Sequence, residues 1–180
     1  IAPARSLPVR LAMAFAAAAN CERGGVDMCG ECLSCKKITH GNHPDVIRIL
    51  PLKDKRYVII DQLRELQKLV QYGPTAGKRM FAIIREIESP KTEAANSGLK
   101  LFEEPPAGVS LIIVTDRAEA ILPTIRSRAQ HIRFNSLPPA LVKKYLSEHY
   151  SFKAEELENY YALSGGSLGR VKDIRELLPQ

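Results

Sequence analysis

The sequence lacks the long hydrophobic runs that mark membrane proteins. Its longest apolar run, LAMAFAAAA at residues 11–19, is too short to span a bilayer, which takes about 20 residues. The run follows Arg5 and Arg10 and could pass for the core of a secretory signal, but Ala, Leu and Met are also strong helix formers. A buried helix is therefore the favoured interpretation, with a signal peptide as the alternative.

The sequence also lacks an initiating Met, a run of like charge, an internal repeat and a low-complexity segment. Because the chain begins with Ile1, it is expected to be a fragment of a longer protein. Its 26 basic residues are interspersed with 20 acidic ones, so the net charge of +6 allows a nucleic-acid partner without demonstrating one. A length of 180 residues, 45% of them hydrophobic, suffices for one sizeable core and a small appended domain.

Cysteine is absent outside one short segment, where four cysteines occur with the spacing C-x7-C-x2-C-x2-C. Without a secretion signal the compartment is reducing, and disulfides are disfavoured there. Two intervening residues let a pair of thiolates converge on one tetrahedral ion, and a second pair closes its shell. Cys21, Cys29, Cys32 and Cys35 are thus predicted to bind one structural zinc ion. A redox-active CxxC pair and an iron–sulfur cluster are the alternatives.

Further along the chain, the apolar pattern alternates between short strands and amphipathic helices. Strands are expected at residues 46–50, 80–84, 109–115 and 130–134. Helices are expected from Asp61, read as an N-cap, and at residues 92–102. Strands separated by helices imply a parallel sheet with both faces covered, so an α/β domain is predicted.

The strand pattern stops after Phe134. A helix is expected to begin at SLPP, a second to cover residues 154–163, and a third to reach about Leu178. A small helical domain is therefore predicted, with a boundary near Ser136 that separates residues 1–135 from residues 136–180.

The loop GPTAGKR at residues 73–79 superficially resembles a phosphate-binding loop. Only three residues separate its glycines, and Arg79 stands where a hydroxyl would hold Mg²⁺. The loop also precedes a strand, whereas a phosphate loop follows one so that the next helix directs its amides at the phosphates. A turn that leads into the strand at residues 80–84 is the favoured interpretation.

Six motifs occur in an order that resembles a known family: CGECLSC, GNHPDV, IDQLREL, EAANSGLKLFEEPP, ILPTIRSR and SGGSLGRV. Their order is similar to that in the clamp-loader branch of the AAA+ ATPases, as found in bacterial DNA polymerase III. This resemblance implies an AAA+-type parallel sheet flanked by helices with a zinc knuckle, then a small helical lid domain. A collar domain would follow Gln180. It also implies a cytoplasmic, nucleoid-associated role in DNA replication, with no membrane partner.

The residues that form the phosphate loop in the family's ATPases are replaced in this sequence. In the alignment, Ala2 and Leu7 occupy the positions of the loop's two glycines. Pro8 occupies the position of its lysine, and Val9 that of its hydroxyl-bearing residue. A Cβ at the first of these positions crowds the backbone that should approach phosphate. Proline supplies neither an ammonium group nor an amide donor, so no ATP binding is expected.

The magnesium site implied by the resemblance is altered independently. Arg85 occupies the position of the aspartate that holds Mg²⁺ in the family's ATPases, where its positive charge would repel the metal. Glu86 occupies the position of the catalytic carboxylate. Glu86 is then expected to be a solvated or ion-paired surface acid. The two losses together favour a non-catalytic subunit over the gamma/tau ATPase subunits.

Other positions take their expected roles from the same resemblance. Ser127 and Arg128 match a Ser-Arg pair whose arginine reaches the ATP of a neighbouring subunit, so both are predicted as catalytic residues in trans. Thr115 and Arg170 match nucleotide-sensing positions, for which a strand-end hydrogen bond and lid packing are favoured. His40 and His43 are expected to make structural hydrogen bonds, since four thiolates already fill the metal shell.

The implied function is that of a non-catalytic clamp-loader subunit. Its expected partners are the gamma/tau ATPase subunits and the delta subunit, together with the sliding clamp and primer-template DNA in the full complex. Two alternatives remain: a gamma/tau-like subunit that binds ATP through an aberrant loop, and a zinc-containing DNA-binding module.

Overall fold

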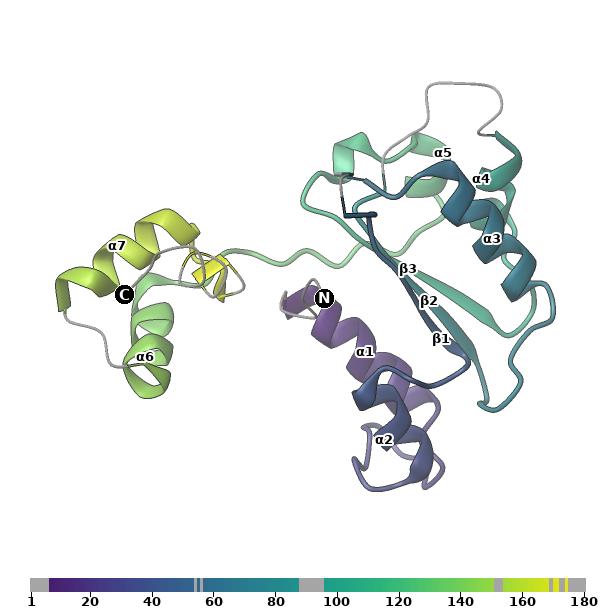
Figure 1. Cartoon of the computed structure of the whole chain (residues 1–180), viewed down its shortest axis with the longest axis horizontal. Coiled ribbons are helices and arrows are strands. Elements are labelled where there is room, and N and C mark those ends of the chain that lie inside the picture. The colour runs from purple at the N-terminus through teal and green to yellow at the C-terminus, as the bar shows by residue number, and fades with distance from the viewer. Residues whose placement is uncertain are drawn as a thin grey trace. The chain divides into compact units, whose positions relative to one another are not determined.

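The computed structural model describes residues 7–53, 55, 57–87, 96–150, 154–168, 170, 171 and 174 (Figure 1). The chain divides into two compact units, with the division falling between His131 and Ile132. The larger unit is Leu11–His131, and the smaller one is Ile132–Gln180 together with Ile1–Arg10. No helix in the described ranges has the length and apolarity needed to cross a membrane.

A three-stranded parallel sheet forms the centre of the larger unit. Its strands are β1 (Val46–Ile49), β2 (Met80–Arg85) and β3 (Val109–Val114), in the order β1-β2-β3. Val46 is in register with Phe81, and Met80 is in register with Val109. The first five residues of β2 are buried, as expected for a central parallel strand with both faces covered. The predicted α/β class and three of the predicted strands are therefore confirmed.

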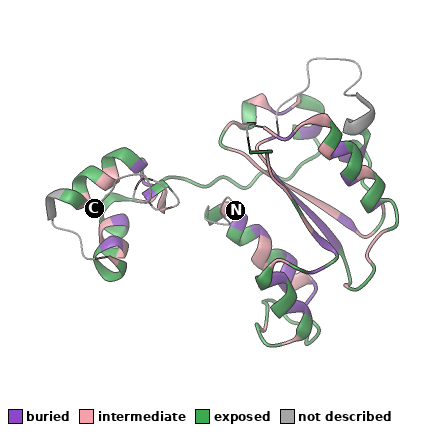
Figure 2. Ribbon diagram, in the orientation of Figure 1, coloured by how far each residue is buried: buried purple, intermediate pink, exposed green. Residues whose placement is uncertain are grey.

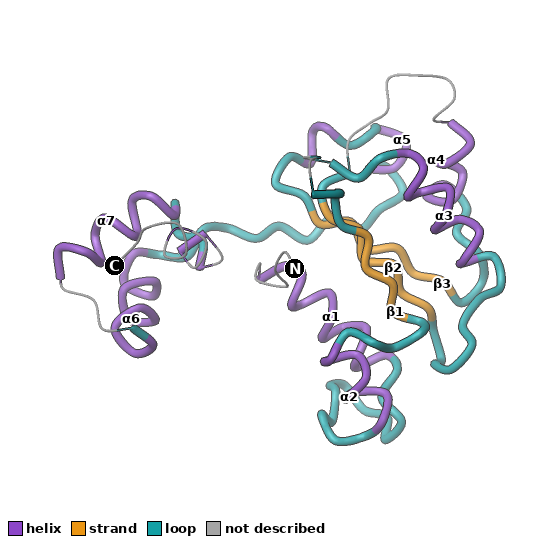
Figure 3. The backbone as a smooth tube through the Cα atoms, in the orientation of Figure 1, coloured by secondary structure: helices purple, strands orange, loops and turns teal. Residues whose placement is uncertain are grey.

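Helices cover both faces of this sheet (Figure 3). One face is packed by α1 (Leu7–Ala19) and α2 (Leu33–His40), and the other by α3 (Ile60–Val70), α4 (Asn96–Glu103) and α5 (Pro123–Arg126). A short 3-10 helix, η2 (Ala118–Ala120), precedes α5. Phe81 and Ile83 face the α1–α2 side, whereas Ala82 and Ile84 face the other side. The alternation follows from the two-residue period of a strand.

The helix α1 is amphipathic rather than buried on all sides. Ala12 and Ala16 are buried against the sheet, whereas Leu11 and Phe15 are 48% and 60% exposed. Small side chains on the inner face let the helix approach the strands closely, and the bulkier ones are left on the outer face. The expectation of a buried helix therefore holds for one face only.

The helix α3 begins earlier than the sequence predicted. Its N-cap is Ile59, whose amide donates to the Gln62 side-chain oxygen at 3.2 Å, while Asp61 lies in the first turn. The side chain of Gln62 thus satisfies the amide of the N-cap residue, and Asp61 is a residue of the first turn rather than the N-cap. The start of the helix predicted at residues 92–102 lies outside the described residues, and the remainder is α4.

The strand expected at residues 130–134 does not form. Residues 130–138 have no regular secondary structure, and Ile132 and Phe134 are 68% and 43% exposed. A strand needs a neighbour for its backbone hydrogen bonds, and among the described strands none pairs with this segment. Alternating apolar residues alone were insufficient to specify a strand.

The smaller unit contains α6 (Pro139–His149) and α7 (Ala154–Ser164), which confirm two of the predicted helices. Its core is formed by Val142, Leu146 and Val171. The amide of Leu137 donates to the Gly166 carbonyl at 3.2 Å. A Cβ on Gly166 would lie 2.8 Å from the Leu137 carbonyl oxygen, and the residue has φ of 78°, so this turn requires glycine. Most of the third predicted helix lies outside the described residues.

Candidate functional site

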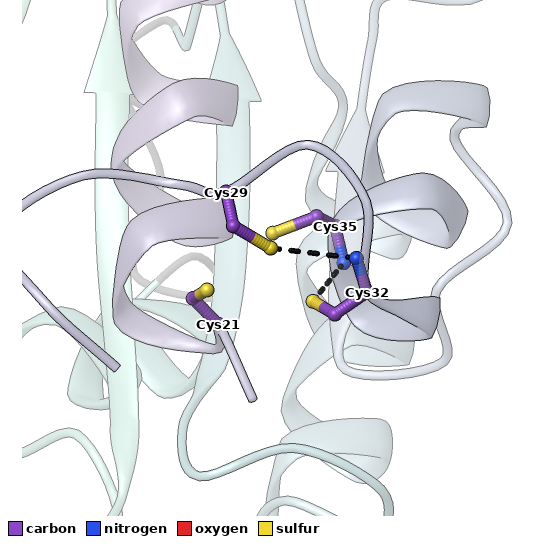
Figure 4. Close-up of side chains that lie close together, drawn as sticks. All are labelled: Cys21, Cys29, Cys32 and Cys35. Atoms are coloured by element: carbon purple, nitrogen blue, oxygen red, sulfur yellow. Dashed lines mark hydrogen bonds between the residues drawn. The ribbon is translucent and has the colours of Figure 1, made fainter. Parts of the chain in front are cut away.

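The four cysteines converge on one point beside α1 and α2 (Figure 4). Cys21 follows α1, Cys29 lies in the connecting loop, Cys32 is the N-cap of α2, and Cys35 lies in its first turn. Their Sγ atoms all lie within 4.8 Å of one another, and none forms a disulfide. Four sulfurs bound at about 2.3 Å to a tetrahedral ion would lie about 3.8 Å apart, so this arrangement fits a metal ion.

Backbone amides prepare two of these sulfurs to bind a cation. The Cys32 amide donates to the Sγ of Cys29, and the Cys35 amide donates to the Sγ of Cys32, both at 3.4 Å. The amides of Cys32 and Glu31 lower the pKa of Cys29 to about 6, and the Cys35 amide lowers the pKa of Cys32. Burial instead raises the pKa of Cys35 to about 12, so its thiolate requires a nearby cation.

The two histidines near the cluster make hydrogen bonds within the protein. The Nε2 of His43 lies 3.1 Å from the Ser34 hydroxyl, and its Nδ1 accepts from the Asp45 amide at 3.1 Å. Burial lowers the pKa of His43, which favours the neutral ring that can accept this bond. The Nδ1 of His40 lies 2.6 Å from the Lys36 carbonyl. Among the described residues, the cysteines alone form a group suited to a metal, as the sequence predicted.

Asn20 connects the cysteine cluster to the start of β2. Its side chain is buried, and its Oδ1 accepts from the amides of Lys78 and Arg79 at 2.8 and 3.0 Å. Its Nδ2 donates to the Arg79 carbonyl at 2.9 Å, and the Lys78 ammonium donates to the Cys21 carbonyl at 2.8 Å. A Cβ on Gly77 would lie 2.6 Å from the Asn20 Oδ1, so glycine makes this approach possible.

Asp45 is fully buried and organises the same loop. Its Oδ1 accepts from the amide and the hydroxyl of Thr75 at 2.7 and 2.9 Å, and its Oδ2 accepts from the amides of Ala76 and Gly77. Burial opposes the charged form, but these hydrogen bonds outweigh it and hold the pKa of Asp45 below its ordinary value. The loop that resembles a phosphate loop does bind an anion, and that anion is the protein's own carboxylate. Sequence reasoning missed this role of Asp45.

The carboxyl ends of β2 and β3 carry a second cluster of charged residues. The Arg85 Nε lies 3.9 Å from the Glu86 Oε1, and Thr115 donates to the Glu86 Oε2 at 3.5 Å. Burial, followed by the nearby Asp116, raises the pKa of Glu86. Glu86 is therefore an ion-paired and partly buried acid rather than a solvated one. It also has φ of 54°, the one positive value at a non-glycine residue in the described ranges.

The residues aligned with a phosphate loop do not form a loop where they are described. Leu7, Pro8 and Val9 form the first turn of α1, and Val9 is buried. Ala2 lies outside the described residues. Proline is tolerated in the first turn of a helix because that position needs no amide donor, but it removes a donor that a phosphate would use.

Ser127 and Arg128 follow α5 and are exposed. The hydroxyl of Ser127 and the Nη1 of Arg128 both donate to the Thr124 carbonyl at 3.1 Å. Arg128 forms no ion pair with the described residues, which leaves its guanidinium accessible. Thr115 makes the expected strand-end hydrogen bonds, since its hydroxyl also accepts from the Arg117 amide at 3.0 Å.

Replacing Asp45 with Asn should lower the free energy of unfolding at neutral pH by about 3 kcal/mol, because an NH₂ group would face backbone donors. The pKa of Asp45 is lower in the folded protein than in the unfolded chain, so its carboxylate stabilises the fold at pH values above the ordinary aspartate pKa. This stability is lost as the pH falls through the pKa of the folded state. The difference between wild type and variant in urea unfolding should therefore shrink in acid. Asp61→Asn, on the exposed surface of α3, is the matched control and should change stability little. Equal effects of the two substitutions would contradict the role of Asp45.

Residues 2–138 match the family described as DNA polymerase III, delta subunit. DNA polymerase III subunit delta' of Pseudomonas aeruginosa is 33% identical over 160 residues, which are 87% of this chain and 48% of that protein. Subunit delta' of Bacillus subtilis is 33% identical over 71% of this chain and 38% of its own length. The chain thus spans about half the length, or less, of these relatives.

The fold resembles that of a DNA polymerase III gamma subunit-related protein from Thermotoga maritima. The TM-score is 0.56 at 24% identity, over 81% of this chain and 47% of that one. Subunit tau of Bacillus subtilis is 30% identical over 92% of this chain and 30% of its own length. The extent of the family match and the agreement of its relatives identify the chain as a member of the DNA polymerase III delta-subunit family, which its delta' relatives represent.

Proposed function

We propose that this chain is part of a non-catalytic, delta-prime-type subunit of the bacterial clamp loader. The observation that carries the proposal is the ion pair of Arg85 with Glu86 at the carboxyl end of β2. The guanidinium of Arg85 occupies the position at which the family's ATPases hold Mg²⁺, and it pairs with Glu86 at the position of the catalytic carboxylate. The helical Pro8 adds an independent loss, because it provides neither an amide nor an ammonium group for phosphate.

The proposed arrangement is an AAA+-like domain at residues 1–135 and a lid domain at residues 136–180. In this arrangement the subunit acts as a scaffold in the cytoplasm. It binds the gamma/tau ATPase subunits and the delta subunit, and it supports loading of the sliding clamp onto primer-template DNA. The tau and delta' relatives support this choice of partners, since their names place them in DNA polymerase III.

The ion proposed for the cysteine cluster is zinc. Four thiolates and no carboxylate suit zinc, and a closed set of four ligands serves structure rather than catalysis. When bound, the ion would supply the positive charge that the buried Cys35 thiolate requires. It would also fix the turn between α1 and α2, where few apolar side chains are buried.

The purified chain should contain one zinc ion, and Cys32→Ser should lose it. Zinc bound to such sites contributes about 10–16 kcal/mol of apparent binding free energy at pH 7. Amide exchange in the variant should accelerate around residues 21–41, while β2 amides remain protected within their own core. Met28→Ala, in the same loop but without a ligand atom, is the control and should keep the metal. Metal analysis without zinc, or iron–sulfur absorbance, would show the assignment to be wrong.

ATP with Mg²⁺ should not change the melting temperature of the chain. A ligand that does not bind the native state cannot stabilise it, whereas one present at a hundred times its Kd contributes about 2.7 kcal/mol. Differential scanning fluorimetry over a range of ATP concentrations provides the measurement. A melting temperature that rises with ATP would instead support the gamma/tau-like alternative.

Arg128 is proposed to act on ATP bound by a neighbouring subunit, with Ser127 beside it. The guanidinium is exposed and free of ion pairs among the described residues, and it is oriented by its bond to the Thr124 carbonyl. A planar guanidinium can contact two oxygens of the transferred phosphoryl group and stabilise charge as it develops. A subunit that has lost its own ATP site can therefore still complete a neighbour's site.

Arg128→Ala should slow ATP turnover at the neighbouring site by on the order of 10³ without disrupting assembly. The full-length variant is assembled with gamma/tau and delta subunits, and ATP hydrolysis and clamp loading are then measured. Arg128→Lys should rescue poorly because an ammonium group lacks the planar fork. Arg126→Ala, at another exposed position in the same segment, should behave as wild type. Normal clamp loading by the Arg128→Ala complex would disprove the role in trans.

A further inference from the structure

The cysteine knuckle, which comprises residues 21–40, has an exposed apolar surface beside two lysines. Val26, Met28 and Leu33 are 103%, 40% and 61% exposed. Together with Lys36 and Lys37 they define the knuckle surface. Figure 2 shows this loop and the outer face of α2 mostly in the colour of exposed residues. Exposed apolar side chains that are grouped rather than scattered commonly mark interaction sites.

The helix α2 places Leu33 and the lysines on one face. Leu33, Lys36 and Lys37 are exposed, whereas Cys35 and Ile38 are buried on the opposite face. Residues three and four positions apart lie next to one another on a helix, so Leu33 adjoins both lysines.

The cysteine cluster joins the loop to the start of this helix. Met28 precedes Cys29, and Leu33 follows Cys32. The sulfurs of these two cysteines lie within 4.8 Å of each other, which keeps the two ends of the segment together. Met28 and Leu33 therefore each lie directly beside a residue of the cysteine cluster.

The acidic residues of the knuckle are already engaged. Glu22 accepts from the Ser34 amide at 2.9 Å, Glu31 pairs with Arg23 at 2.7 Å, and Asp27 accepts from the Met28 amide at 2.7 Å. Lys36 and Lys37, in contrast, form no ion pair with the described residues. The knuckle surface thus combines apolar side chains with two lysines that form no ion pair with the described residues.

We propose that the knuckle surface docks an acidic peptide segment of a partner protein, one that also carries apolar side chains. A peptide can place carboxylates opposite Lys36 and Lys37 and apolar side chains opposite Leu33 and Met28. A nucleic acid fits less well, because its affinity comes mostly from phosphate contacts, and the exposed apolar side chains of the knuckle surface would gain little from them. Burial of the apolar side chains would provide affinity, and the lysines would orient the segment.

The attachment of the knuckle to the sheet makes this surface suitable for docking. Asn20 and His43 tie the two ends of the knuckle to the loop before β2 and to the buried Asp45. A surface held in this way loses little conformational freedom when a partner binds.

Binding can be tested with fluorescein-labelled peptides and the metal-loaded chain. The main probe is a short peptide of leucine and glutamate. One companion has serine for leucine, another has lysine for glutamate, and a labelled duplex DNA is the fourth probe. We expect saturable anisotropy for the leucine–glutamate peptide alone, with NMR shift changes concentrated at residues 26–40.

The variant Leu33→Ser/Lys37→Glu should weaken this binding about tenfold while retaining metal. The matched control is Leu69→Ser/Lys68→Glu, which makes the same chemical changes at exposed positions of α3 and should bind as wild type. Absence of saturable binding, equal weakening by both variants, or shift changes centred elsewhere would overturn the proposal. Tighter binding of the duplex, or equal binding of the serine peptide, would also overturn it.

Discussion

The buried carboxylate of Asp45 is the constraint on which the amino end of the sheet depends. An ionised group without water requires several donors, and Asp45 receives them from Thr75, Ala76 and Gly77, just before β2. These donors are about thirty positions away in sequence, so satisfying one charge fixes the loop and the start of β2 relative to β1. Asn20 makes the corresponding connection from α1. The position of the cysteine cluster therefore follows from polar groups that must be satisfied as much as from apolar packing.

The two ends of the sheet have different roles. At the amino ends of the strands, hydrogen bonds hold the cysteine cluster against the sheet. At the carboxyl ends, where α/β proteins usually bind ligands, Arg85 and Glu86 neutralise each other. The proposed reactive group, Arg128, instead lies on the exposed segment after α5. In such a protein the chemistry would occur at an interface, and the sheet would serve to position the residue that crosses it.

Much of this organisation could be predicted from the sequence because apolar period and cysteine spacing are local signals. The run Met80–Ile84 specified a buried strand, and the CxxC spacing specified a sulfur cluster. The segment at residues 130–134 was mispredicted because pairing depends on a neighbouring strand, which its own residues do not reveal. The role of Asp45 was missed for a similar reason, since its donors lie far along the chain. Glu86 shows the same limit: its raised pKa depends on burial and on Asp116, which only the fold brings near.

The contrast between local and distant contacts has a consequence for the order of folding. All four cysteines lie within residues 21–35, whereas the bonds from Asn20 to Lys78 and Arg79 join positions 58 and 59 residues apart. Contacts that are close in sequence close small loops and form fast, while distant ones must wait for more of the chain. On a ribosome, the cysteines would emerge well before β2 existed. A metal could then be captured by a nascent chain, and the sheet would be assembled afterwards against a knuckle that had already formed.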